Sequence, residues 1–152
     1  MKNRFVAFIV GRRSIAAAVF EDLKLSFWQA RSYQAKSDKA ASAVTAFVNF
    51  IIERCDIEAA GLEAIQSDLK TRMAELNRLV EQLLREHSIP VSAASDDLLF
   101  ASYSYPPIYS RARLREIAAQ VFPQLRDLSS KEVLDAGLLG LYFQAERLLS
   151  DY

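Results

Sequence analysis

The sequence is poor in the residues that build disulfides, histidine metal sites and unstructured linkers. Its 152 residues include one cysteine, one histidine, four glycines and four prolines. A single cysteine excludes an intramolecular disulfide and favours a reducing compartment. The lone histidine, His87, has no second histidine with which to form a metal site. With 51% hydrophobic residues, the composition is that of a well-packed globular chain and excludes a disordered one.

Net charge and long apolar runs are also lacking. Nineteen basic residues balance nineteen acidic ones, so a nucleic acid or an anionic membrane would need a local basic patch. No apolar run approaches the 18 residues of a membrane span, and Arg12 and Arg13 interrupt the apolar stretch near the N-terminus. The glycine patterns of Walker-type and dinucleotide-binding loops are absent. We therefore expect one soluble, cytoplasmic domain over residues 1–152, with no membrane partner.

The first 33 residues predict three consecutive antiparallel strands. Residues 5–10 are apolar on both faces, which is typical of a central strand covered on both sides. Residues 15–20 return beside them after a turn, and residues 25–33 follow a second turn. Both faces of this third segment mix polar and apolar residues, as expected for an edge strand.

Helices and two further strands are predicted after this meander. Residues 57–65 follow a helix and indicate a buried parallel strand. Residues 89–94 indicate a short fifth strand, with Pro90 at its start. Helical spacing predicts helices over about 38–55, 71–87, 95–103, 110–122 and 130–149, with a loop over 104–109. Cys55 falls on the buried stripe of the first helix. The last helix has its stripe at Leu134, Leu138, Leu141, Tyr142, Ala145 and Leu148, with Gly137 and Gly140 against the sheet.

The order of these elements, together with two local motifs, resembles a known fold. Residues 60–64 read Ala-Gly-Leu-Glu-Ala, and residues 132–141 place Glu132 and Asp135 three apart before a small and apolar run. This arrangement is similar to the ribonuclease H-like superfamily, and within it to the RuvC-type Holliday junction resolvases. The resemblance implies an α/β fold with a five-stranded mixed sheet and helices on both faces. Its first three strands are antiparallel, and the fourth and fifth run parallel to the first.

The resemblance also implies catalytic positions. It assigns them to Glu63, Glu132 and Asp135, with Glu63 and Asp135 as metal ligands if Mg²⁺ binds. The family's first-strand aspartate falls on Val10, which cannot ligate Mg²⁺. A two-metal nuclease needs carboxylates that hold both ions. The substitution therefore predicts that metal-dependent cleavage has been lost.

Each acidic residue has a structural alternative. Glu132 forms a capping box with Ser129, three residues earlier, and Glu63 emerges into solvent at the end of its strand. Asp135 lies on or beside an apolar stripe, where a carboxylate is costly unless it is hydrogen-bonded or metal-bound. Conversely, Asp96 or Asp97, after the fifth strand, could be recruited as a metal ligand.

Arginines suggest a contact surface for nucleic acid. Arg12 and Arg13 occupy the turn after the first strand, while Arg111 and Arg115 lie one helical turn apart near several tyrosines. Arginine binds phosphate bidentately, and tyrosine can stack on bases. The alternative is a solvated helix face in which Glu116 balances the arginines.

Three functions follow from these observations. The first is a resolvase-like domain that has lost cleavage and binds structured DNA or a protein partner. The second is an active Mg²⁺-dependent endonuclease that uses Glu63, Glu132, Asp135 and a recruited Asp96 or Asp97. The third is a homodimeric structural domain without catalysis. Fold resemblance alone does not choose among them.

Overall fold

The computed structural model describes residues 3–34, 37–64, 71–103, 110–126 and 130–150. Five strands form one sheet in the order β3-β2-β1-β4-β5. The strands are β1 (Arg4–Val10), β2 (Ser14–Glu21), β3 (Lys24–Ser32), β4 (Ala59–Glu63) and β5 (Val91–Ala94). β1 pairs antiparallel with β2 and parallel with β4, β2 pairs antiparallel with β3, and β4 pairs parallel with β5. The predicted mixed sheet is confirmed.

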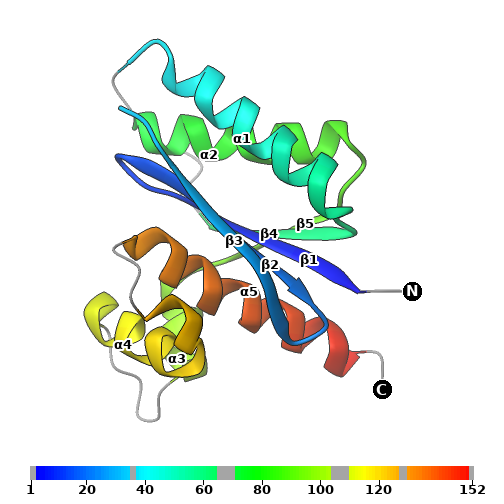
Figure 1. Cartoon of the computed structure of the whole chain (residues 1–152), viewed down its shortest axis with the longest axis vertical. Coiled ribbons are helices and arrows are strands. Elements are labelled where there is room, and N and C mark those ends of the chain that lie inside the picture. Colours follow the sequence, from blue (N-terminus) through cyan, green and yellow to red (C-terminus); the bar gives the residue numbers. More distant parts are fainter. Residues whose placement is uncertain (1–2, 35–36, 65–70, 104–109, 127–129, 151–152) are drawn as a thin grey trace.

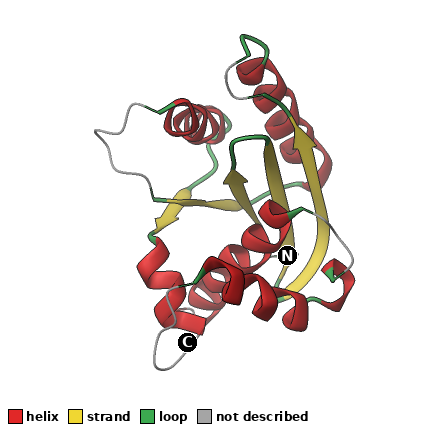
Figure 2. Cartoon of the chain, turned by 90° about the vertical axis from the view of Figure 1, so that its left-hand side faces the viewer, coloured by secondary structure: helices red, strands yellow, loops and turns green. Residues whose placement is uncertain are grey.

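The helices cover both faces of this sheet (Figures 1 and 2). They are α1 (Ala40–Cys55), α2 (Arg72–Glu86), α3 (Asp96–Tyr103), α4 (Arg111–Val121) and α5 (Lys131–Ser150), with a short 3-10 turn, η1 (Pro123–Leu125). Figure 1 shows α1 and α2 on one side of the sheet and α3, α4 and α5 on the other. The predicted loop at 104–109 lies outside the described residues. No helix in the described ranges is both long and apolar enough to span a bilayer.

Alternation along β1 divides the core into two clusters. Val6, Phe8 and Val10 pack with residues of α1 and α2, whereas Phe5, Ala7 and Ile9 pack with residues of α5. Successive side chains of a strand point to opposite faces, so a central strand that is apolar throughout serves both clusters. This explains why residues 5–10 carry no polar residue.

The apolar face of α5 differs from the predicted stripe. The residues buried against the sheet and its neighbours are Val133, Ala136, Leu138, Leu139, Gly140 and Phe143, while Leu134, Leu141 and Tyr142 are only partly buried. A side chain at Gly140 would meet Phe20 of β2, as predicted, but one at Gly137 would meet Phe122 and Leu125. The prediction for Gly137 was therefore wrong, because α4 and η1 cover that side of the helix.

The start of α1 also differs from its prediction. The helix begins at Ala40, after Lys39 as the N-cap residue, and no acidic residue lies in its first turn. Asp38 falls in the preceding turn, where Ser37 Oγ accepts a hydrogen bond from Lys39 N at 3.1 Å. At the other end, Cys55 is buried as expected, with 8% of its surface exposed.

Candidate functional site

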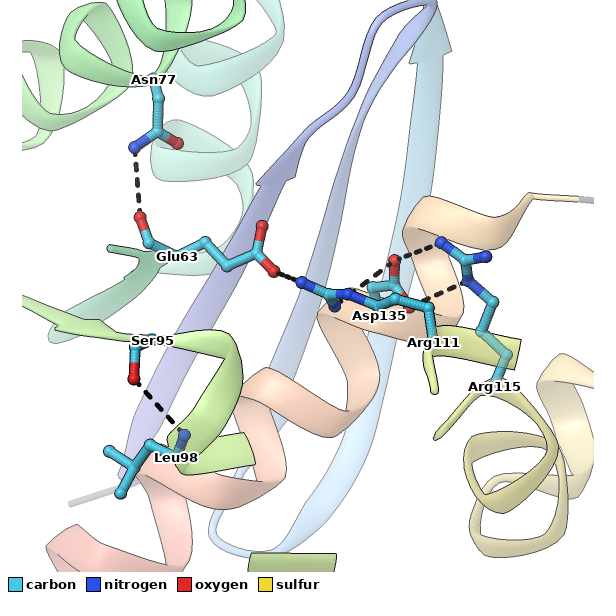
Figure 3. A network of polar contacts seen from close by, with 7 residues as sticks. All are labelled: Glu63, Asn77, Ser95, Leu98, Arg111, Arg115 and Asp135. Atoms are coloured by element: carbon cyan, nitrogen blue, oxygen red, sulfur yellow. Dashed lines mark hydrogen bonds and ion pairs between the residues drawn. The ribbon is translucent and has the colours of Figure 1, made fainter. Parts of the chain in front are cut away.

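Glu63 lies at the end of β4 and points toward α4 and α5. A side chain at Gly61, two residues earlier on the same face, would meet Phe143 of α5. The Glu63 carbonyl accepts a hydrogen bond from Asn77 Nδ2 at 3.3 Å, which ties the strand end to α2. The Glu63 carboxylate forms an ion pair with Arg111 (Figure 3). Its side chain is 24% exposed, so the expected solvated position at the strand end is only partly realised.

Asp135 is buried in the first turns of α5 and bound by two arginines of α4. Its side chain is 8% exposed. Arg115 Nε lies 3.1 Å from Oδ1 and Arg115 Nη2 lies 3.0 Å from Oδ2, a bidentate pair. Arg111 Nη1 lies 3.9 Å from Oδ2. In Figure 3 the Arg111 guanidinium lies between the carboxylates of Glu63 and Asp135.

Local sequence explains how α4 presents both arginines. Ser110 is the N-cap residue, and its side chain accepts from Arg113 N at 3.3 Å. Leu114 and Ala118 are the buried residues that anchor the helix. Residues i and i+4 share one face of a helix, so Arg111 and Arg115 point the same way. Arg113 points elsewhere and pairs with Glu116 at 2.7 Å, as in the predicted solvated face.

Glu132 lies against the turn between β1 and β2. A Cβ at Gly11 would lie 2.7 Å from Glu132 Oε1, so in its present rotamer the glutamate occupies the space beside the glycine. Ser129 of the predicted capping box lies outside the described residues, and Val133 N donates at 3.3 Å to Ser130 Oγ. Ser130 therefore supplies a cap at the start of α5.

A tyrosine reinforces this turn. Tyr33 Oη donates to the Gly11 carbonyl at 2.5 Å. Burial raises the pKa of Tyr33 to about 12, and the negative charge of Glu132 contributes to the rise. The raised pKa keeps the hydroxyl protonated, and therefore a donor, beyond the pH near 10 at which an ordinary tyrosine ionises.

Burial raises the pKa of the Asp135 carboxyl above its usual value. The hydrogen bonds and charge of Arg115, and the charge of Arg111, offset part of that rise, while Glu132 adds to it. A buried carboxylate without partners would be strongly destabilising, and removal of one member of a buried ion pair is costly for the same reason. The two arginines are what allow Asp135 to be charged in this position.

The described carboxylates do not fit a two-metal site. Glu63 and Asp135, the proposed metal ligands, already have guanidinium groups as partners. Across the described ranges, no group of three histidine, cysteine, aspartate or glutamate residues is placed to hold an ion. The side chains of Asp96 and Asp97 are not among those described.

Val10 and Asp135 face opposite sides of the sheet. Val10 is 8% exposed and packs in the cluster formed with α1 and α2, whereas α5 covers the other face. The β1 residue on the Asp135 side is Ile9. The sequence pattern identified the strand end but not the direction of this side chain.

The predicted arginines occupy two different settings. Arg12 and Arg13 are exposed in the turn after β1, whereas Arg111 and Arg115 are partly buried, with 28% of each side chain exposed, and bind the site carboxylates. Sequence reasoning treated the arginines of α4 and the acidic residues as separate sets. The sequence signal that could have predicted these ion pairs was an acidic residue on a buried helix face together with two arginines at i,i+4 spacing.

Comparison with known proteins identifies the fold. No model of a protein family matches the sequence, and no curated protein matches it. Among solved structures, RuvC of T. thermophilus in complex with a Holliday junction substrate superposes with a TM-score of 0.76 at 14% identity, over 95% of each chain. The yeast mitochondrial Holliday junction resolvase Ydc2 gives 0.65 at 11% identity, covering 99% of this chain and 82% of its own.

A viral enzyme gives a similar result. The fowlpox virus Holliday junction resolvase superposes with a TM-score of 0.62 at 13% identity, over 94% of this chain and 99% of its own. These identities are low, so the similarity concerns the arrangement of the backbone. The chain therefore has the RuvC-like ribonuclease H fold.

Proposed function

We propose that this chain is a resolvase-fold domain that has lost metal-dependent cleavage and binds structured DNA. The observation that carries the proposal is the position of Arg111, whose guanidinium contacts both Glu63 and Asp135. In this arrangement the arginines supply the positive charge that divalent ions supply in a two-metal nuclease.

The arginines oppose metal binding for an electrostatic reason. The guanidinium group keeps its proton at all accessible pH values and forms its strongest pairs with carboxylates in bidentate geometry. Arg115 has this geometry on Asp135. A Mg²⁺ ion would have to displace Arg111 and Arg115, and it would also need near-octahedral oxygen ligation. Charge neutralisation by the two arginines therefore favours a site without metal.

Two observations support DNA as the partner. Similar solved structures include RuvC with a Holliday junction substrate and the fowlpox virus resolvase with Holliday junction DNA. In this chain, Arg12 and Arg13 are exposed at the β1–β2 turn. This turn borders the candidate site, because Glu132 lies against Gly11. A protein partner at the same surface is the alternative that a binding assay distinguishes.

A cleavage assay tests the loss of catalysis. Labelled four-way junctions are incubated with the protein and Mg²⁺ or Mn²⁺, with T. thermophilus RuvC as the positive control. We expect no cleavage by the wild-type chain. Cleavage that needs a divalent ion and is abolished by Asp135→Asn would overturn the proposal. It would favour an active endonuclease built on Glu63, Glu132, Asp135 and one of Asp96 or Asp97.

A binding assay tests the remaining role. Fluorescence anisotropy with labelled junction, duplex and single-stranded DNA should show binding that weakens with salt, with the junction bound most tightly. If none of these ligands binds while sedimentation shows a dimer that does not depend on concentration, the domain is a structural homodimer and the proposal fails.

A further inference from the structure

A small basic hollow lies where β3 ends and α1 begins. It has a volume of about 210 Å³ and is lined by Arg31, Ser32, Tyr33, Gln34, Ser37, Lys39, Ala40 and Ala43. Two of these residues are basic and none is acidic. Asp38, which is exposed, is the only acidic residue between positions 31 and 52. The hollow is therefore a local basic site on a chain without net charge.

The cations of this region differ from those of α4 in their partners. Arg111, Arg113 and Arg115 each form an ion pair with a carboxylate. Arg31 and Lys39 are exposed, and neither forms an ion pair with a carboxylate of the described residues. Exposed cations without a bound carboxylate retain their charge for an external anion.

The first turn of α1 adds to the positive potential. Its N-cap residue, Lys39, makes no side-chain cap, and the turn contains no acidic residue. The amino-terminal end of a helix carries partial positive charge on its unpaired N–H groups, which favours phosphate. This contribution acts in the same place as the charges of Arg31 and Lys39.

Tyr33 connects the hollow to the candidate functional site. It lines the hollow and also donates its hydroxyl to the Gly11 carbonyl. Its own backbone N–H donates to the Arg13 carbonyl at 2.8 Å. Ser14, after this turn, pairs with Ser32, next to Arg31. The turn that carries Arg12 and Arg13 is thus attached directly to the end of β3 by backbone and side-chain bonds.

We infer that Arg12, Arg13, Arg31 and Lys39 form one surface, the β3–α1 basic strip, which binds the phosphodiester backbone of a nucleic acid. The inference rests on the proposed function and assigns the contact to particular residues. It replaces the sequence expectation for Arg111 and Arg115, whose guanidiniums bind Glu63 and Asp135. Lysine and arginine contacts to phosphate provide affinity without sequence specificity, so binding should depend on salt rather than on sequence.

The test compares single charge removals at the two ends of β3. Arg31→Ala and Lys39→Ala remove a charge from the strip. Lys24→Ala removes a charge from the opposite end of the strand, where the adjoining hollow also contains Glu21 and Asp22. Binding of a labelled four-way junction is measured by anisotropy over a range of salt concentrations. Circular dichroism and thermal unfolding verify that each variant is folded.

We expect Arg31→Ala and Lys39→Ala each to weaken junction binding by about three- to tenfold at low salt. Each should also reduce the slope of log K against log salt by about 0.9, the value for one lost phosphate contact. Lys39→Glu should weaken binding further, and Lys24→Ala should change it by less than about twofold.

Two outcomes would contradict the inference, and they differ in what they mean for the proposed function. If the wild-type chain binds the junction and the Arg31 and Lys39 variants bind it with unchanged affinity and slope, the strip is not the contact surface, but the proposed function stands. If the folded wild-type chain binds no DNA at low salt, the proposed function fails and the assignment of the strip fails with it.

Discussion

Arg115 of α4 holds Asp135 of α5 through two parallel hydrogen bonds, at 3.1 and 3.0 Å. The contact joins two helices on the same face of the sheet and places a guanidinium on a carboxylate that is 8% exposed. Arg111 extends the network to Glu63 at the end of β4 (Figure 3). Ion pairs thereby connect the end of β4 and the start of α5 to α4.

Loss of Arg115 should destabilise the fold more than loss of an exposed arginine in the same helix. Arg115→Ala leaves Asp135 buried with only the more distant Arg111, and we expect a decrease of about 3 kcal/mol in the free energy of unfolding. Arg113→Ala is the matched control, because the Arg113–Glu116 pair is exposed and should contribute less than about 1 kcal/mol. Urea denaturation of both variants measures the difference. Equal effects would show that the Asp135 pair is not structurally important.

The buried carboxyl of Asp135 should give stability a particular pH dependence. Its pKa in the folded chain is raised, mainly by burial, so the folded state binds the proton more tightly than the unfolded state. The stability that this group contributes must then fall as pH rises through the interval above its unfolded pKa, and rise as pH is lowered. The unfolding free energies of the wild type and Asp135→Asn, compared between about pH 7 and about pH 4, should show the wild type gaining relative to the variant. A relative loss would mean that the arginines dominate and lower the pKa.

Alanine substitutions at Gly61 and Gly11 should lower stability by different amounts, because one glycine lies against a core aromatic ring and the other against the end of a flexible side chain. In Gly61→Ala the new Cβ would lie 2.4 Å from Phe143 Cδ2, inside the packed core between β4 and α5. We expect a loss of about 1–3 kcal/mol of stability, as for other overpacked sites. In Gly11→Ala the nearest atom is Glu132 Oε1, at the far end of a long side chain that can rotate away. Thermal unfolding should therefore show a clearly smaller effect for Gly11→Ala, and the reverse order would contradict the packing described here.

The hydroxyl of Tyr33 should stabilise the β1–β2 turn in its protonated form. Tyr33→Phe removes the bond to the Gly11 carbonyl and should cost about 1 kcal/mol at neutral pH. Because the folded pKa is raised to about 12, the stabilisation is complete below the unfolded value near 10 and is lost as pH rises through 12. Burial also raises the pKa of Tyr103 and Tyr142, so the measurement is the difference between two absorbance titrations. The wild type should show one more late-ionising tyrosine than Tyr33→Phe. If the tyrosine lost in Tyr33→Phe is one that ionises near 10, the bond does not persist in solution.

Cys55 should be unreactive in the folded chain. It is 8% exposed, and burial raises the pKa of its thiol despite the opposing charges of Arg54 and Arg4. Since the thiolate is the reactive form, a thiol reagent at neutral pH should label Cys55 slowly in the native protein and completely in denaturant. Rapid stoichiometric labelling without denaturant would show that the end of α1 opens readily.

The central position of β1 and the edge position of β3 were predictable because the evidence for each is local. An apolar run with no polar interruption indicates a central strand, as in residues 5–10, and a mixed pattern indicates an edge strand, as in β3. The bounds of α5 were also close to those predicted, but its buried face was not. The predicted stripe left out five residues that are buried, namely Val133, Ala136, Leu139, Phe143 and Gln144. Contacts from η1, α4 and the N-terminal segment decide that face; Gln144 Nε2, for example, donates to the Asn3 carbonyl at 2.9 Å.

The sequence by itself determined the kind and order of the strands and helices, because apolar patterning, caps and breaks in each segment agree with one another. The resemblance of two local motifs to the RuvC-type resolvases assigned Glu63, at the end of β4, and Glu132 and Asp135, at the start of α5, to one site. Only the tertiary structure decided what those carboxylates bind. Arg111 and Arg115 lie 48 and 20 residues away from Glu63 and Asp135 in the chain, and an ion pair across that separation depends on how α4 packs. The charge balance of the site is therefore a property of helix packing, which no local pattern encodes.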